Sequence, residues 1–189
     1  MINFEQDVEN CLEVLHSGGI ILYPTDTVWG LGCDATNPAA VEKIIALKGK
    51  SNNKGLIVLL ANERDILQYV AAPDPAIFDF FDTILRPTTV IYDNGIGVAD
   101  NVLNQDGSLA IRLVSEDFCR HLLKRFKKPI VSTSANLTGQ PTPKIFAEIQ
   151  TEITSKVDYL VSYRQTDPTI GFASDVVKWE NQKMVYLRK

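Results

Sequence analysis

The sequence has few of the residues on which several classes of protein depend. Its three cysteines are widely spaced and form no C-x-x-C pair, which argues against a disulfide framework or a cysteine-rich zinc site and favours reduced thiols. It has only two histidines, His16 and His121, and neither lies near a candidate nucleophile in the sequence. Spacing typical of metal ligands is absent as well. We therefore expect no metal held by the protein alone, and we expect both histidines at the surface.

Long hydrophobic runs and an excess of positive charge are also missing. No stretch approaches the roughly 20 apolar residues that cross a bilayer. The segment from Met1 to Asp7 lacks the cationic and apolar regions of a signal peptide. These features predict a cytoplasmic protein without membrane contact. A formal net charge of −4 argues against nucleic-acid binding as the main role, although a local basic cavity is compatible with it.

The composition and the pattern of segments predict one α/β domain spanning residues 1–189. Hydrophobic residues make up 45% of the chain, enough for a sizeable core. Segments of helical periodicity alternate with short β-branched or continuously apolar segments, which predicts a mixed, largely covered sheet. The expected helices begin near residues 4, 37, 62, 74, 115 and 142, and the expected strands cover 20–23, 55–60, 88–92, 109–114, 129–131, 157–161, 174–177 and 184–187.

Two polar segments directly follow apolar strands. Thr25, Asp26 and Thr27 come after the first strand, at the kind of sheet edge where α/β proteins bind ligands. Ser132 to Asn136 follows a later strand, and its hydroxyls and backbone N–H groups are suited to phosphate or carboxylate oxygens. The same segment is also compatible with a turn that satisfies its own backbone. Neither segment contains the glycine pattern of a P-loop or a dinucleotide-binding fold.

Cationic side chains near these segments have two interpretations each. Lys48, Lys50 and Lys54 follow the helix that begins near residue 37, and they suit either a solvated turn or a polyanion such as a nucleoside triphosphate. Arg112 lies within an apolar strand, where a long charged side chain needs a partner. That partner is either a buried carboxylate or a bound anion. The residues alone leave both questions open.

Four motifs, taken in order, resemble the YrdC family, and the resemblance as a whole covers nearly the whole chain. They are Tyr23–Asp34, Lys48–Leu56, Leu109–Arg112 and Pro129–Gly139. The resemblance implies a twisted mixed sheet flanked by helices, with a concave ligand cavity. It also implies an L-threonylcarbamoyladenylate synthase, a nucleotidyltransferase that uses L-threonine, bicarbonate and ATP to make threonylcarbamoyl-AMP for tRNA modification.

The same resemblance implies site residues and partners. The ATP-binding set is Lys48, Lys50, Lys54, Ser108, Ser134, Asn136, Thr142 and Arg188, and the threonine-binding set is Thr27, Arg112, Ser132 and Ser174. Magnesium would bridge the phosphates, and a tRNA threonylcarbamoyl transferase complex would use the product. Weak RNA binding is a further expectation. Since no general base or covalent nucleophile is evident, catalysis would depend on positioning and charge neutralisation.

One position departs from the family pattern in a way that affects function. Lys50 replaces the usual arginine, which keeps the charge but loses the planar guanidinium that binds phosphate through two N–H groups. This difference leaves a second function open. The alternative is a non-catalytic or divergent YciO-like paralogue that binds nucleotide or RNA.

Overall fold

A computed structural model describes residues 4–49, 55–180 and 183–189. Its helices are Glu5–His16 (α1), Pro38–Leu47 (α2), Glu63–Asp65 (η1), Ile66–Tyr69 (α3), Ala76–Phe81 (α4), Asp100–Val102 (η2), Asp117–Phe126 (α5), Phe146–Glu148 (η3) and Thr151–Thr154 (α6). Its strands are Ile21–Tyr23 (β1), Gly30–Asp34 (β2), Ile57–Leu60 (β3), Thr88–Tyr92 (β4), Leu109–Leu113 (β5), Ile130–Ser134 (β6), Tyr159–Leu160 (β7), Asp175–Glu180 (β8) and Lys183–Arg188 (β9).

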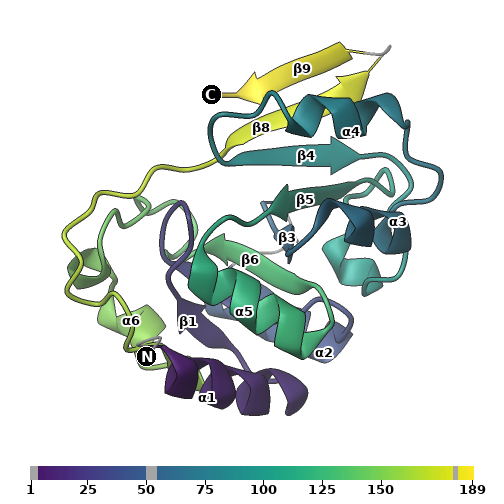
Figure 1. The fold of residues 1–189 in the computed structure, drawn as a ribbon. Coiled ribbons are helices and arrows are strands. Elements are labelled where there is room, and N and C mark those ends of the chain that lie inside the picture. The colour runs from purple at the N-terminus through teal and green to yellow at the C-terminus, as the bar shows by residue number, and fades with distance from the viewer. Residues whose placement is uncertain (1–3, 50–54, 181–182) are drawn as a thin grey trace.

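One mixed sheet runs through the molecule. Its strands lie in the order β7-β1-β2-β6-β3-β5-β4-β8-β9. The pairs β1–β7, β3–β5 and β4–β8 are parallel, and the other neighbouring pairs are antiparallel. Helices α1 and α5 pack side by side in front of the lower strands in Figure 1, and α2 packs against β2. The expected mixed sheet flanked by helices is confirmed.

The start and end of α2 agree with the sequence pattern. The side-chain oxygen of Asn37 accepts hydrogen bonds from the backbone N–H groups of Ala39 (3.0 Å) and Ala40 (3.2 Å), which otherwise lack helical partners. Pro38 occupies the first helical position, where no N–H is needed. Gly49 follows the helix with a φ of 65°, a left-handed conformation that glycine adopts without steric cost.

One observed strand, β2, was not expected, and two others, β6 and β8, end later than expected. Gly30 and Gly32 of β2 are poor strand formers. The segment nevertheless pairs with β1 on one side and β6 on the other. A side chain at Gly32 would collide with Tyr23, since its Cβ would lie 2.6 Å from Cε1 of that ring. Strand β6 continues to Ser134, so the second polar segment begins inside a strand rather than after it.

The expected cap of α5 is off by one residue. Glu116, not Ser115, occupies the N-cap position. The Glu116 carboxylate accepts a hydrogen bond of 2.9 Å from the Cys119 N–H. A carboxylate at this place satisfies a free N–H and also interacts favourably with the helix dipole.

The helix expected to begin at Thr142-Pro143 is absent. The backbone there is bonded to other groups instead of to a helical turn. The Lys144 N–H donates to the Glu148 carboxylate (2.7 Å), and the Lys144 carbonyl accepts from the Gly171 N–H (3.0 Å). Phe146 lies in the short helix η3 and Ile153 in α6, whereas Ile145 and Ile149 flank η3.

His16 and His121 are exposed, as expected. Cys11, Cys33 and Cys119 are buried free thiols. No helix in the described part of the chain is long and apolar enough to cross a membrane.

Candidate functional site

A cavity lies where strands of the sheet meet four segments that lie outside the strands. It holds about 550 Å³ of empty space, including its open mouth. The strands contribute Gly30 of β2, Ile57 of β3, Arg112 of β5, Ser132–Ser134 of β6 and Arg188 of β9, and the other lining residues are Thr27, Val28, Gly55, Thr142, Ala173 and Ser174.

The register of the central strands explains the room in this cavity. Gly30 pairs with Ser134 and Gly32 with Ser132, so the two serines lie next to residues without side chains. Because alternate residues of a strand point to the same face, Ser132 and Ser134 share one face of β6. A Cβ added at Gly30 would lie 3.0 Å from the Ser132 Oγ. The missing side chain at Gly30 therefore leaves space in the cavity, whereas the space at Gly32 is filled by the Tyr23 ring.

The structure brings most of the predicted site residues together. All four residues of the predicted threonine-binding set and three of the predicted ATP-binding set line this one cavity: Thr27, Arg112, Ser132, Ser174, Ser134, Thr142 and Arg188. Lys50 and Lys54 lie outside the described residues. Lys48, Ser108 and Asn136 are described but are not among the residues that line the cavity.

Arg112 forms a buried ion pair. Its Nη2 lies 3.1 Å from the Asp26 Oδ1, and the two side chains are 5% and 7% exposed. The same Nη2 donates a long hydrogen bond of 3.4 Å to the Thr25 hydroxyl. The buried Nε has no hydrogen-bond partner among the described residues. Of the two partners that the sequence allowed for Arg112, the structure shows the buried carboxylate. The Nε of Arg112 is still an unpaired donor, and the residue lines the cavity.

Two threonines outside the predicted binding sets, Thr25 and Thr89, hold residues of the cavity in place. The hydroxyls of Thr25 and Thr27 lie 2.9 Å apart, and the Thr25 hydroxyl also accepts from the Thr27 N–H (3.1 Å). Thr89 of β4 lies 2.8 Å from the Ser174 hydroxyl, oxygen to oxygen. Arg188 donates to the Ser174 carbonyl (2.9 Å). Thr25 was detectable from its place in the first polar segment, whereas Thr89 gave no signal in the sequence.

Lys48 contacts the backbone beside the cavity. The side chain is buried, and its ammonium donates to the carbonyl oxygens of Ser134 and Asn136, the latter at 2.7 Å. The Thr138 N–H donates to the Lys48 carbonyl (3.0 Å). Lys48 therefore fixes the end of β6 and the turn after it. Its predicted contact with ATP remains a prediction.

Ser108 and Asn136 are also engaged in local hydrogen bonds. The Ser108 hydroxyl donates to the Asp106 carboxylate (2.6 Å). The Asn136 amide donates to the carbonyl oxygens of Leu137 (3.0 Å) and Gln140 (2.9 Å), while its own oxygen has no partner among the described residues. Both residues stabilise turns next to β5 and β6.

The lining favours an anionic ligand with polar groups. It combines hydroxyls with the guanidinium groups of Arg112 and Arg188, and none of the described lining residues is a carboxylate. No group of three His, Cys, Asp or Glu side chains within residues 4–49, 55–180 and 183–189 could hold a metal ion. A magnesium ion held by the protein alone therefore does not fit these residues, because magnesium prefers carboxylate and water oxygens.

Comparison with known proteins assigns the chain to a family. A family model for Sua5, YciO and YrdC proteins, described as telomere recombination, matches residues 13–189. The chain belongs to the Sua5/YciO/YrdC family. Two relatives, both called threonylcarbamoyl-AMP synthase, support the assignment. One from Photobacterium profundum is 36% identical over 78% of this chain and 81% of its own, and one from Idiomarina loihiensis is 36% identical over 79% and 83%.

Solved structures of the Sua5/YciO/YrdC family show the same fold. A P. abyssi Sua5 complexed with L-threonine matches with a TM-score of 0.81 and 21% identity over 97% of this chain, which spans about half (54%) of that Sua5 chain. E. coli YciO matches with a TM-score of 0.81 and 21% identity over 97% of this chain and 89% of its own. The expected resemblance to the YrdC family is confirmed.

Proposed function

We propose that this protein is an L-threonylcarbamoyladenylate synthase that makes threonylcarbamoyl-AMP from L-threonine, bicarbonate and ATP. One observation carries the proposal. A single cavity gathers all four predicted threonine-binding residues and three predicted nucleotide-binding residues from opposite ends of the chain. Relatives that cover about four fifths of the chain are called threonylcarbamoyl-AMP synthase, which supports the same activity.

In this proposal, Arg112 binds the carboxylate of threonine. The guanidinium is already oriented by Asp26 and retains a buried N–H without a partner. A buried unpaired donor is costly, and an anionic oxygen would relieve that cost. Thr27, Ser132 and Ser174 supply short hydroxyls around the same space, where they would pair with the ammonium and hydroxyl groups of threonine.

The nucleotide would occupy the part of the cavity near Ser134, Thr142 and Arg188. Arg188 provides a guanidinium suited to phosphate oxygens, and Ser134 and Thr142 provide hydroxyl donors. Lys54 directly precedes Gly55, which lines the cavity. This adjacency supports the prediction that Lys50 and Lys54 bind the triphosphate. Magnesium would then enter with ATP, bound by phosphate oxygens.

The proposed reaction forms two bonds. The amine of threonine attacks the carbon of bicarbonate, and loss of water leaves a carbamate. A carbamate oxygen then attacks the α-phosphorus of ATP, and pyrophosphate leaves. The cavity would contribute by holding the reactants in contact and by neutralising negative charge, since its lining offers cations and hydroxyls but no carboxylate to act as a base.

The proposed product places the protein before tRNA modification. A tRNA threonylcarbamoyl transferase complex would consume threonylcarbamoyl-AMP, which implies a cytoplasmic location and allows weak contact with RNA. The direct test is to incubate the purified protein with ATP, threonine, bicarbonate and magnesium and to detect the adenylate by mass spectrometry. Formation of threonylcarbamoyl-AMP is expected. Binding of ATP without any adenylate would reject the synthase and favour a nucleotide-binding YciO-like paralogue.

A further inference from the structure

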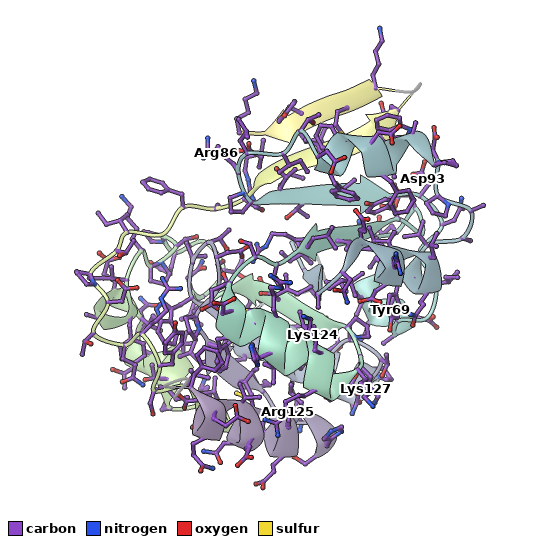
Figure 2. The ribbon with its side chains drawn as sticks, in the orientation of Figure 1. Tyr69, Arg86, Asp93, Lys124, Arg125 and Lys127 are labelled. Atoms are coloured by element: carbon purple, nitrogen blue, oxygen red, sulfur yellow. The ribbon has the colours of Figure 1, made fainter. Side chains whose placement is uncertain are left out.

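A second hollow lies on another part of the surface, between α3 and the end of α5. This groove holds about 790 Å³ of empty space, including its mouth. Its lining residues are Leu60, Ala61, Asn62, Asp65, Gln68, Tyr69, Leu123, Lys124, Lys127 and Lys128, none of which lines the cavity described above. Figure 2 shows Tyr69 from α3, and Lys124 and Lys127 from the α5 end, on the same side of the molecule.

The groove is locally basic although the whole chain is acidic. Three lysines and one aspartate line it. Lys128 is paired with the buried carboxylate of Asp34 at 2.7 Å. Lys124 and Lys127 form no ion pair with any described residue. Two ammonium groups in a concave surface therefore remain available for an external anion.

The backbone at Lys127 gives a second, independent observation. Lys127 has a φ of 56° and a ψ of 24°, the left-handed conformation at the C-terminal cap of α5. Glycine or asparagine usually occupies this position, because other residues adopt the conformation at a cost. The helix dipole favours a cation in the last turn, and Lys124 and Arg125 already provide it. Lys127 therefore keeps a cationic side chain in the groove at a position where glycine would have the lower backbone cost.

Tyr69 decides which anion suits the groove. It is partly exposed and lines the groove. The Gly97 backbone supports the ring, since a Cβ added there would lie 3.2 Å from the Tyr69 Cδ1. Burial raises the pKa of the Tyr69 phenol, so its hydroxyl remains a neutral donor. An aromatic ring beside lysines matches a nucleobase and its phosphate, whereas an acidic peptide needs only the lysines.

We propose that this groove is a second nucleotide-binding site, separate from the cavity. Lys124 and Lys127 bind the phosphate, and Tyr69 contacts the base. The ligand is a nucleoside 5′-phosphate unit, either as a free nucleotide or as part of a single-stranded RNA. This assignment does not depend on the proposed synthase activity, because it involves none of the cavity residues.

The test is an NMR titration of the ¹⁵N-labelled protein, which distinguishes the groove from the cavity by residue. One arm uses AMP and the other uses a short single-stranded RNA. Amide shifts around Tyr69 and Lys124 to Lys128 are expected with at least one of them. Groove amide shifts with AMP would identify the ligand as a free nucleotide, and groove amide shifts with RNA alone would identify it as a single-stranded RNA. Shifts confined to the cavity in both arms would overturn the proposal.

Variants connect these shifts to the lysines. The double variant Lys124→Gln/Lys127→Gln should weaken binding in the groove about tenfold or more and reduce its dependence on salt. Lys156→Gln is the matched control, because Lys156 is an exposed lysine that lies outside the groove. Equal affinities in the double variant and the control would reject the site. Polyglutamate that displaces the ligand as efficiently as RNA does would also reject it, in favour of an acidic protein partner.

Lys127→Gly separates binding from folding. Glycine suits a φ of 56°, so this variant should raise the urea midpoint of unfolding while it weakens binding in the groove. A variant that is more stable and binds as tightly as the native protein would show that Lys127 has no part in the site.

Discussion

The buried pair between Arg112 and Asp26 permits a quantitative test of the cavity. Both side chains are at least nine-tenths buried, and their charged atoms lie 3.1 Å apart. Replacing Asp26 by Asn keeps the shape but leaves the Arg112 charge without its counter-ion. Removal of one partner from a buried pair costs about 3–5 kcal/mol, mainly because the other charge stays buried. We expect Asp26→Asn to lose about 3 kcal/mol of unfolding free energy, the lower end of this range.

A double-mutant cycle isolates this effect. Arg112→Met removes the opposite charge, and the double variant removes both. The double variant should be more stable than Asp26→Asn alone, because no uncompensated charge remains. Urea unfolding followed by circular dichroism measures all four proteins. Additive losses, or a loss under about 1 kcal/mol for Asp26→Asn, would refute the view that the pair is desolvated and mutually dependent.

Ligand binding in the same variants tests the function of the pair. If Asp26 orients Arg112 toward the threonine carboxylate, Asp26→Asn should weaken threonine binding, and Arg112→Met should abolish it. The ATP affinity should change little in either, since the nucleotide contacts proposed above are Ser134, Thr142, Arg188 and the lysines Lys50 and Lys54, none of which is Arg112 or Asp26. Calorimetric titration with each ligand makes the distinction. Equal loss of both ligands would indicate general damage to the cavity.

Three further predictions concern selectivity, thiols and acid stability. Adenylate formation should be fastest with threonine, slower with serine and slowest with valine. Serine lacks only a methyl group, worth about 1 kcal/mol, whereas valine lacks the hydroxyl and leaves polar groups of the cavity unpaired. Equal rates with valine and threonine would contradict the assigned contacts. Burial raises the pKa of the Cys11, Cys33 and Cys119 thiols, so mass spectrometry should find no iodoacetamide label on the native protein at pH 8 and three labels in urea. Hydrogen bonds from Thr169 lower the pKa of the Asp167 carboxyl from 3.8 to about 2. Its contribution to stability is complete above about pH 4 and is lost as the pH falls through about 2, so Asp167→Asn should flatten the loss of stability in this range during acid titration.

The fold class and most of the site were accessible from the sequence, because local signals and the family motifs agreed. Asn37-Pro38 identified the start of α2, and the apolar segments identified most strands. Strand β2 was missed because its glycines contradict strand propensity, and only pairing with strands far along the chain supplies the hydrogen bonds. The helix expected after Thr142 failed for a similar reason, since Gly171 binds its backbone from a distant segment.

The partners of the site residues could not be predicted from single positions. Arg112 was recognised as a buried cation, but its pairing with Asp26 requires the loop after β1 to reach β5. Thr89 looks like any β-branched strand residue, and only the sheet order brings it to Ser174. Lys48 was grouped with Lys50 and Lys54 by spacing, yet its ammonium holds the backbone at the end of β6.

The position of β9 has a consequence for the dynamics of the cavity. Strand β9 forms one edge of the sheet (Figure 1) and pairs only with β8 among the described strands. Most of its side chains are exposed. Edge hairpins with few buried contacts open locally at a lower free energy than the central strands. Each such opening withdraws Arg188 from the cavity and breaks its hydrogen bond to the Ser174 carbonyl. A ligand bound to Arg188 therefore adds to the free energy needed to open the hairpin, and amide exchange in β8 and β9 should slow when the cavity is filled.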